Sequence, residues 1–274
     1  GDQADAKFGY SVATAGDVNG DGFSDVIIGA YLYDDGNIDE GKAFVYHGSA
    51  TGLSTTPNWT AKSSQANAQF GISVAPAGDV NGDGYSDVIV GAYKYDNGET
   101  DEGAAFVYHG SASGLSMTAN TTLESNQASA AFGWSVATAG DVNGDGYSDV
   151  IVGVSWYDNG ETDEGAAFVY HGSASGVSTT ANWTVESNQA SANFGISVAT
   201  AGDVNGDGYA DVIIGAYLYD NGQTDEGAAF AYHGSATGLS TTANRTLESN
   251  QASAYFGYSV APAGDVNGDG YADV

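Results

Sequence analysis

A nine-residue segment rich in acidic and amide side chains is the part of this 274-residue chain best suited to chemistry. Its first copy reads DVNGDGFSD, from Asp17 to Asp25. Side-chain oxygens stand at positions 1, 3, 5 and 9, and a backbone carbonyl is available at position 7. Glycine at position 6 allows a sharp turn, and hard oxygen ligands in this arrangement suit Ca²⁺. The segment therefore predicts a calcium-binding loop.

The same segment occurs five times, so we expect up to five Ca²⁺ ions, one per loop. The helical calcium motif requires Glu at position 12, where this chain has Ile28, so a strand-loop-strand site is expected. The alternative is a set of Asx turns without metal. Calcium is favoured because three carboxylates brought together without a cation would repel one another. The predicted ligands, with position 7 counted for its carbonyl, are Asp17, Asn19, Asp21, Phe23, Asp25, Asp79, Asn81, Asp83, Tyr85, Asp87, Asp141, Asn143, Asp145, Tyr147, Asp149, Asp203, Asn205, Asp207, Tyr209, Asp211, Asp265, Asn267, Asp269, Tyr271 and Asp273.

The loops belong to a longer internal repeat, which is marked by Phe-Gly pairs 62 residues apart. Residues 70–131 and 132–193 differ at only ten of 62 positions. The sequence therefore divides into four full units and a truncated fifth within one propeller domain or a fragment of one. The expected boundaries are 1–7 for the tail of a preceding unit, 8–69, 70–131, 132–193 and 194–255 for the full units, and 256–274 for the partial one.

Each unit contains four short segments with the composition of β-strands and none with a helical period. In the first unit these are residues 11–15, 26–30, 43–47 and 58–61. Four strands in a 62-residue repeat are typical of a β-propeller blade. The fold expected is thus all-β, a β-propeller of four-stranded blades with four full repeats and a truncated fifth. The strand of small residues, 11–15, is expected innermost, where blades crowd at the axis.

Two sequence runs carry a resemblance to a known family. They are FGISVA, from Phe70, and GDVNGDGYSDVIVGA, from Gly78 to Ala92. Together they resemble the FG-GAP repeat of integrin α-subunit propellers and of bacterial FG-GAP proteins, over essentially the whole chain. The resemblance implies Ca²⁺ in the loop between the first two strands of each blade, and extracellular adhesion or ligand binding. Integrin propellers have seven divergent blades, whereas these repeats are nearly alike, so the ligand specificity of integrins is not carried over.

A binding surface is expected at the end of the propeller opposite the calcium loops, where the resemblance also places ligand binding. Antiparallel strands put the residues around Phe8 and the loop 31–41 at that end. The repeats differ there while most of each unit is constant, although tolerance of variation in loops is an alternative explanation. The predicted ligand-binding residues are Tyr10, Leu32, Lys94, Trp134, Trp156 and Tyr258.

Three other features have less specific interpretations. The acidic loop with Asp34, Asp35, Asp39 and Glu40 could hold a second cation, but a solvated loop is favoured. One histidine per unit, such as His47, is expected to pack rather than to bind metal or catalyse. The Asn-x-Thr sequences at Asn58, Asn120, Asn182 and Asn244 are interpreted as repeated strand starts rather than glycosylation sites.

Composition excludes several classes of partner and site. Thirty-five acidic against five basic residues give a net charge of −30, which would repel nucleic acid and anionic membranes. The chain has no cysteine and no apolar run long enough for membrane insertion. It contains no nucleophile elbow and no phosphate-binding glycine loop, and its repeat symmetry is hardly broken. We therefore expect a protein that is not an enzyme.

The function predicted from sequence is a calcium-stabilised β-propeller that acts as an adhesion or ligand-binding module outside the cell or at its surface. Its expected ligand is an extracellular protein or glycan. One alternative is a lectin with one site per blade, and another is a structural array that assembles edge to edge. Five complete blades would need 310 residues and four leave 26 over, so self-association through open blade edges is also expected.

Overall fold

The chain is built only of β-strands, loops and turns in the computed structural model, which describes residues 3–274. Its sixteen strands form four antiparallel sheets of four strands each. In sequence order the strands are β1 Ser11–Gly16, β2 Asp25–Ala30, β3 Lys42–Tyr46, β4 Trp59–Lys62, β5 Ser73–Gly78, β6 Asp87–Ala92, β7 Ala104–Tyr108, β8 Thr121–Leu123, β9 Phe132–Gly140, β10 Asp149–Val154, β11 Ala166–Tyr170, β12 Trp183–Glu186, β13 Ser197–Gly202, β14 Asp211–Ala216, β15 Ala228–Tyr232 and β16 Arg245–Glu248.

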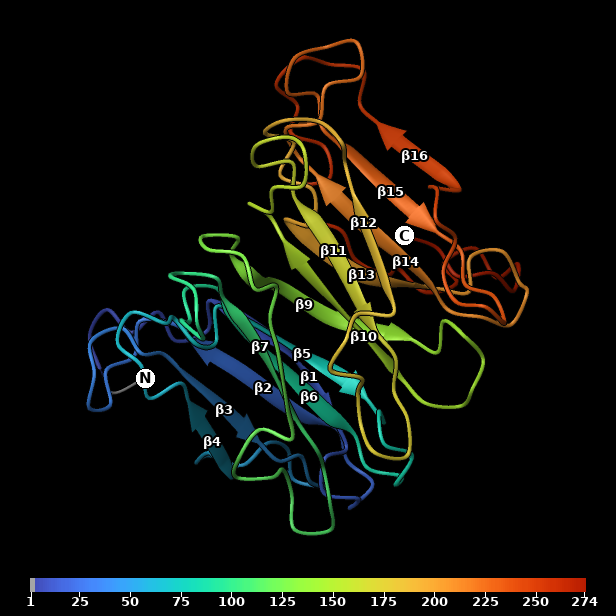
Figure 1. Cartoon of the computed structure of the whole chain (residues 1–274). Helices are drawn as coiled ribbons and strands as arrows, with labels where there is room; N and C mark the ends of the chain where they lie inside the picture. Colours follow the sequence, from blue (N-terminus) through green and yellow to red (C-terminus); the bar gives the residue numbers. More distant parts are fainter. Residues whose placement is uncertain (1–2) are drawn as a thin grey trace.

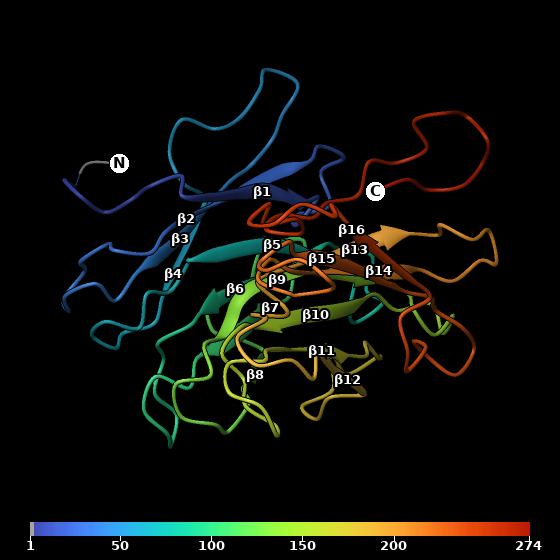
Figure 2. The ribbon, with the colours of Figure 1, turned by 90° about the horizontal axis from the view of Figure 1, so that it is seen from above.

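Each sheet is one propeller blade, in which consecutive strands pair as neighbours (Figure 1). The four-stranded blade and the all-β fold expected from the repeat are confirmed. The first strands β1, β5, β9 and β13 lie side by side near the centre when the molecule is viewed from above (Figure 2). Small side chains permit this approach. The Ser11 hydroxyl accepts a hydrogen bond from the Val74 amide at 3.0 Å, and the Ser73 hydroxyl donates to the Gly133 carbonyl at 2.8 Å.

Apolar side chains fill the space between neighbouring blades, so each blade completes the core of the next. Phe70 and Tyr108 of the second blade pack in one cluster with Val45 and Trp59 of the first. The Trp59 indole also donates a hydrogen bond across this junction to the Ser116 carbonyl, at 2.8 Å. A blade has two apolar faces, and a single sheet cannot bury both. Packing between blades therefore buries these apolar faces.

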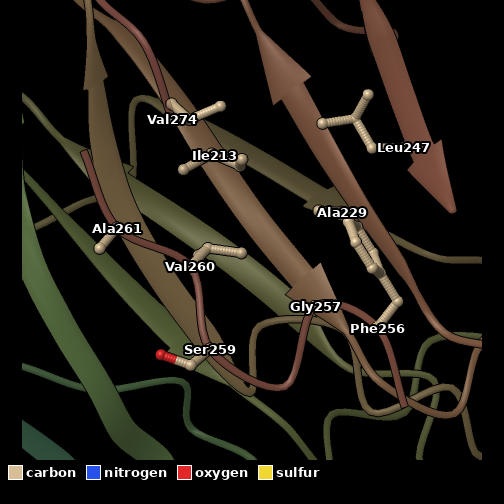
Figure 3. A pocket seen from close by; sticks show the side chains of 9 residues that line it. All are labelled: Ile213, Ala229, Leu247, Phe256, Gly257, Ser259, Val260, Ala261 and Val274. Atoms are coloured by element: carbon tan, nitrogen blue, oxygen red, sulfur yellow. The ribbon is translucent and has the colours of Figure 1, made fainter. Parts of the chain in front are cut away.

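The partial fifth repeat leaves one blade face open. Residues 256–274 form two isolated bridges, Phe256 to Gly227 and Gly264 to Asp273, instead of the inner strand expected there. An open apolar pocket of about 260 Å³ lies between them and the fourth blade (Figure 3). Leu247, which lines it, is 42% exposed, whereas its counterpart Leu123 in the second blade is 1% exposed. The pocket thus occupies the position that the interior of a blade junction takes elsewhere in the chain.

These two leucines give a matched test of the packing between blades. Replacing Leu123 with Ala should lower the free energy of unfolding by about 2 to 4 kcal/mol, because it leaves a cavity in a closed junction. The same change at Leu247 should cost less than about 1 kcal/mol, because that side chain is already partly solvated. Urea unfolding followed by circular dichroism measures both. Equal losses would show that the two positions have the same packing.

Candidate calcium loops and aromatic face

Each predicted calcium loop is held in a tight turn by its own carboxylates. Asp17 Oδ1 accepts hydrogen bonds from the amides of Gly20 and Asp21, at 2.7 and 3.1 Å, and Oδ2 accepts one from Gly22 at 2.8 Å. The Asn19 side chain accepts from the Asp21 amide at 3.0 Å. The same bonds recur in the other four loops, the partial repeat included. The sequence therefore folds five times into one loop geometry.

The aspartate at position 9 is buried in each of the four complete blades. Asp87 is completely buried, and it accepts hydrogen bonds from the Val80 amide at 2.8 Å and from the Gly110 amide at 2.8 Å. Burial raises the pKa of Asp87 to about 7, and the nearby carboxylates of Asp79 and Asp83 contribute to the rise. Asp149 has the same environment and a pKa raised by burial to about 7. A bound cation would reverse this shift by compensating the buried negative charge.

The donor types of each loop suit a cation, but the three carboxylates of a loop are not gathered around one point. Among residues 3–274, no group of three or more His, Asp and Glu side chains is close enough to form a ready metal centre. Position 9 directs both oxygens at backbone amides, as described for Asp87. Each carboxylate oxygen nevertheless has two lone pairs, so an oxygen that accepts an amide hydrogen bond can also ligate a metal. The donor set of carboxylates, one amide oxygen and one carbonyl suits Ca²⁺.

Hydrogen bonds join each of the first four predicted calcium loops to the next repeat. The Ser86 amide donates to the Asp17 carbonyl at 3.0 Å, and the Ser111 amide donates to the Val18 carbonyl at 3.1 Å. Gly20 has φ +72°, and the ring of Tyr85 from the next loop occupies the space that a Cβ at Gly20 would need. Glycine is therefore required there both for the turn and for the close contact. A change in one loop is transmitted directly to its neighbour.

The histidine of each complete blade lies beside these loops. His47 Nδ1 is 3.1 Å from Asn19 Nδ2, and His171 has the same contact with Asn143. Burial lowers the pKa of His109 and His171, which favours the neutral ring. These contacts suit the packing role that the sequence predicted for the histidines.

Aromatic side chains from several blades gather at the opposite end of the propeller. The ring centroids of Tyr93 in the second blade and Trp134 in the third are 4.8 Å apart, and those of Trp134 and Trp156 are 5.7 Å apart. In the first blade Tyr10 and Tyr31 are in edge contact at 4.8 Å. These rings belong to a group that we call the aromatic face, which comprises Tyr10, Tyr31, Tyr93, Trp134, Trp156, Tyr217, Tyr255 and Tyr258.

The aromatic face includes residues from both the first and the fifth repeat. Burial raises the pKa of Tyr10, and Tyr31 and Tyr258 are near enough to contribute to the rise. Tyr258 belongs to the partial fifth repeat, so this repeat approaches the first blade at the axis. Tyr10 is 60% exposed and Tyr258 is 63% exposed, although both rings have aromatic neighbours. Large exposed rings of this kind are typical of binding surfaces.

Four of the six residues predicted to bind ligand belong to this face, namely Tyr10, Trp134, Trp156 and Tyr258. Lys94 lies at its margin, with Nζ 5.5 Å from the centre of the Tyr93 ring. Leu32 is half-buried and makes none of the aromatic contacts, and its amide donates to the Ala6 carbonyl at 3.3 Å.

Sequence reasoning missed two sets of residues. One repeat position is occupied by Tyr31, Tyr93 and Tyr217 and hardly varies among the repeats. Because the ligand-binding residues were predicted from positions that vary, these tyrosines were not among them. Glu40 was expected in a solvated loop, but it is completely buried, and so are Glu102, Glu164 and Glu226. For these four glutamates the expectation of solvent exposure was wrong. The sequence signal was their strict recurrence one residue before a glycine.

Comparison with known proteins identifies the repeat. The model of the FG-GAP repeat matches residues 8–46, 70–108, 132–170, 194–232 and 256–274, which together make up more than half of the chain. The chain belongs to the FG-GAP repeat family. The resemblance inferred from the Phe-Gly and calcium-loop motifs is thereby confirmed, and all five units that the 62-residue period marked are matched.

Integrin α-subunits are among the relatives of this FG-GAP protein. It is 31% identical to integrin alpha-5 of Xenopus laevis over 225 residues, and 36% identical to integrin alpha pat-2 of Caenorhabditis elegans over 231. These alignments cover 79% and 78% of the chain, and 20% and 18% of the integrins. Over 162 residues it is 38% identical to integrin alpha-V of Gallus gallus, which covers 56% of the chain and 15% of that subunit. The chain thus spans about a fifth of the length of these relatives.

Solved structures that the FG-GAP chain resembles include two enzymes. The exotype rhamnogalacturonan lyase YesX matches 81% of the chain and 44% of its own length, at 16% identity and a TM-score of 0.48. The rhamnogalacturonan lyase YesW gives 16% identity and a TM-score of 0.44. Our expectation that the chain is not an enzyme is corrected by this finding, because structural neighbours of the chain include catalytic proteins. Similarity at this level assigns no reaction to the chain.

No helix suited in length and apolar character to cross a membrane occurs in residues 3–274 of the FG-GAP chain.

One carboxylate gives a direct test of the calcium loops. Replacing Asp145 with Ala removes the position 5 ligand of the third loop, and we expect the chain to bind one Ca²⁺ fewer. Calorimetric titration of the calcium-free protein measures the number of ions. The control is Asp5→Asn, which changes an exposed acid outside the loops and should leave the number unchanged. Equal numbers in both variants would refute the assignment of Asp145 as a ligand.

Proposed function

We propose that this FG-GAP protein is a calcium-stabilised propeller that binds an extracellular ligand through its aromatic face. The observation that carries the proposal is the convergence of exposed Tyr and Trp rings from several blades at one end of the molecule. The integrin relatives support an adhesion or ligand-binding role outside the cell or at its surface. Five Ca²⁺ ions at the other end would stiffen the loops that join the blades.

The aromatic face has the features of a binding surface rather than of a core. Its rings are held in edge-to-face contacts, such as Tyr93 with Trp134 at an interplanar angle of 80°, so they are ordered before a ligand arrives. Trp156 remains 39% exposed. Rigid aromatic side chains bury a large area at a small cost in conformational entropy, which is why they dominate many binding sites. A protein ligand with apolar anchors fits this arrangement.

A glycan is the second candidate ligand. Sugar rings present apolar C–H faces that can stack on Trp and Tyr. The aromatic face offers both at adjacent positions, because Tyr93 lies beside Trp134 and Trp156. The residues at this face differ among the blades, so we expect one shared site rather than one equivalent site in every blade. A protein ligand and a glycan ligand can be distinguished by direct binding assays.

Removal of calcium should destabilise the whole propeller. A site with Ca²⁺ at about 100 times its dissociation constant contributes roughly 2.7 kcal/mol to the free energy of unfolding. Five such sites would contribute on the order of 13 kcal/mol, comparable to the total stability of a domain. Melting curves with excess Ca²⁺ and with a chelator should therefore differ by tens of degrees, and added Ca²⁺ should restore the higher melting temperature. A melting temperature unaffected by the chelator would refute calcium stabilisation.

Loss of two tryptophans should weaken ligand binding without unfolding the protein. In the variant Trp134→Ala/Trp156→Ala we expect affinity to fall at least about tenfold, because buried aromatic anchors each contribute on the order of 1 kcal/mol or more. The probes are a glycan array and a panel of immobilised extracellular-matrix proteins. The control is Met117→Ala, which removes a side chain that is 77% exposed. Met117 lies in the loop after β7, at the end of the propeller that carries the predicted calcium loops. If the control loses as much binding, the aromatic face is not the ligand site.

A further inference from the structure

One completely buried glutamate per blade lies in the loop between the second and third strands. In the second blade it is Glu102, whose Oε1 accepts hydrogen bonds from the amides of Asn97 and Glu99, at 2.6 and 3.3 Å. Its other oxygen, Oε2, is buried and has no hydrogen-bond partner, and the same holds for Glu164 and Glu226. A buried carboxylate oxygen without a partner is unfavourable, so these three sites lack a group that the chain does not supply.

The first blade has a positive charge at the corresponding place. Lys62 Nζ is 3.4 Å from Glu40 Oε1 and 3.6 Å from Asp35 Oδ2, and it also donates a hydrogen bond to the Asp35 carbonyl. The second oxygen of Glu40 accepts from Asn37 Nδ2 at 3.2 Å. Both oxygens of this buried carboxylate therefore have partners. Three oxygens of one loop surround a single ammonium group.

Both of these donors are replaced in the other three blades. The positions of Lys62 and Asn37 are taken by Glu124 and Glu99 in the second blade, by Glu186 and Glu161 in the third, and by Glu248 and Gln223 in the fourth. All three ion pairs within residues 3–274 are made by Asp35 and Glu40 of the first blade. The other basic residues, Lys7, Lys94 and Arg245, form no ion pair within residues 3–274, so no basic side chain fills the other sites.

The second acid is nevertheless held against the loop. In the third blade the Asn159 amide donates to Glu164 Oε1 at 2.6 Å, and Asn159 Nδ2 donates to Glu186 Oε2 at 2.8 Å. One asparagine thus links the buried glutamate and the glutamate that replaces lysine. The second and fourth blades have the same two bonds, made by Asn97 and Asn221. Two carboxylates linked through one asparagine repel each other, and a cation between them would remove this repulsion.

We infer that blades two, three and four each bind one Ca²⁺ where the first blade has the ammonium of Lys62. The ligands in the second blade are the carboxylates of Glu102 and Glu124 and the Asn97 carbonyl, the counterpart of the Asp35 carbonyl that accepts from Lys62. Lys62 contacts Oε1 of the buried glutamate, and the unpartnered Oε2 of Glu102 gives the ion the second oxygen of that carboxylate. Two carboxylates balance a divalent charge, and water completes the coordination of a cation that tolerates irregular oxygen shells. These sites are separate from the predicted calcium loops, which join the first two strands at the other end of each blade.

The inferred ion has a structural consequence for the aromatic face. Each site fixes the loop between the second and third strands, and in the third blade this loop begins beside Trp156. Binding of Ca²⁺ at Glu164 and Glu186 would hold that loop in place. The site thus couples cation binding to the end of the propeller that carries the exposed rings.

The first blade provides the design of the test. The variant E124K/E186K/E248K copies Lys62 into the other three blades, and we expect the full chain to bind three fewer Ca²⁺ ions. The control T122K/T184K/T246K adds three lysines two residues earlier on the same strands, at exposed positions, and should keep the original number. Bound Ca²⁺ is counted by equilibrium dialysis and metal analysis, with circular dichroism as the check of folding. An unchanged number in the folded E124K/E186K/E248K variant would overturn the inference.

Two further variants keep the inference testable. K42A/K62E gives the first blade the residues that stand in the second, Ala104 and Glu124, and should add one ion. If the lysine variant does not fold, E124Q/E186Q/E248Q replaces it, with the same expected loss and the same overturning result. If the predicted calcium loops do not bind Ca²⁺, the unmodified chain will bind fewer ions in total. The lysine variant should still bind three ions fewer than the unmodified chain. The two sets of sites can therefore fail separately.

Discussion

The carboxylate of Asp25 is completely buried, yet it accepts two backbone hydrogen bonds, from Val18 at 3.0 Å and from Gly48 at 2.8 Å. These bonds tie three parts of a blade together, namely the turn after the first strand, the start of the second strand and the loop after the third. Val18 in turn accepts from Ser111 of the next blade. The position of each blade relative to its neighbour therefore depends on a charge that is costly to bury. Repetition of this aspartate gives all four complete blades one geometry.

Most of the fold could be predicted from the sequence because one signal recurs with a constant period. The predicted strand at residues 26–30 is Asp25–Ala30 in the structure, and the predicted strand at 43–47 is Lys42–Tyr46. The fourth strand was the least certain in composition and is also the shortest, only three residues in β8. The interior of a blade junction was less accessible to prediction. It depends on contacts between residues about 60 positions apart, such as Trp59 and Ser116.

The candidate sites were predictable to different degrees for physical reasons. The predicted ligands of each calcium loop lie within nine consecutive residues, so the sequence alone shows them together. Glu40 gave no such signal, because its burial depends on a backbone turn. The residues on either side, Asp39 and Gly41, have φ values of +49° and +78°. Similarly, Tyr10 and Tyr258 lie near each other only because the arc of blades brings the fifth repeat close to the first.

Each type of hydrogen bond between blades recurs with its own fixed separation along the chain. The Trp59 indole bonds to Ser116 and that of Trp183 to Ser240, each 57 residues further on. The Ser86 and Ala272 amides bond to Asp17 and Asp203, each 69 residues earlier. Recombination within the encoding DNA that inserts or deletes one 62-residue repeat in frame would keep every such offset. A lineage could therefore change its number of blades in a single genetic event, and with it the set of rings presented to a ligand, while each junction stays intact.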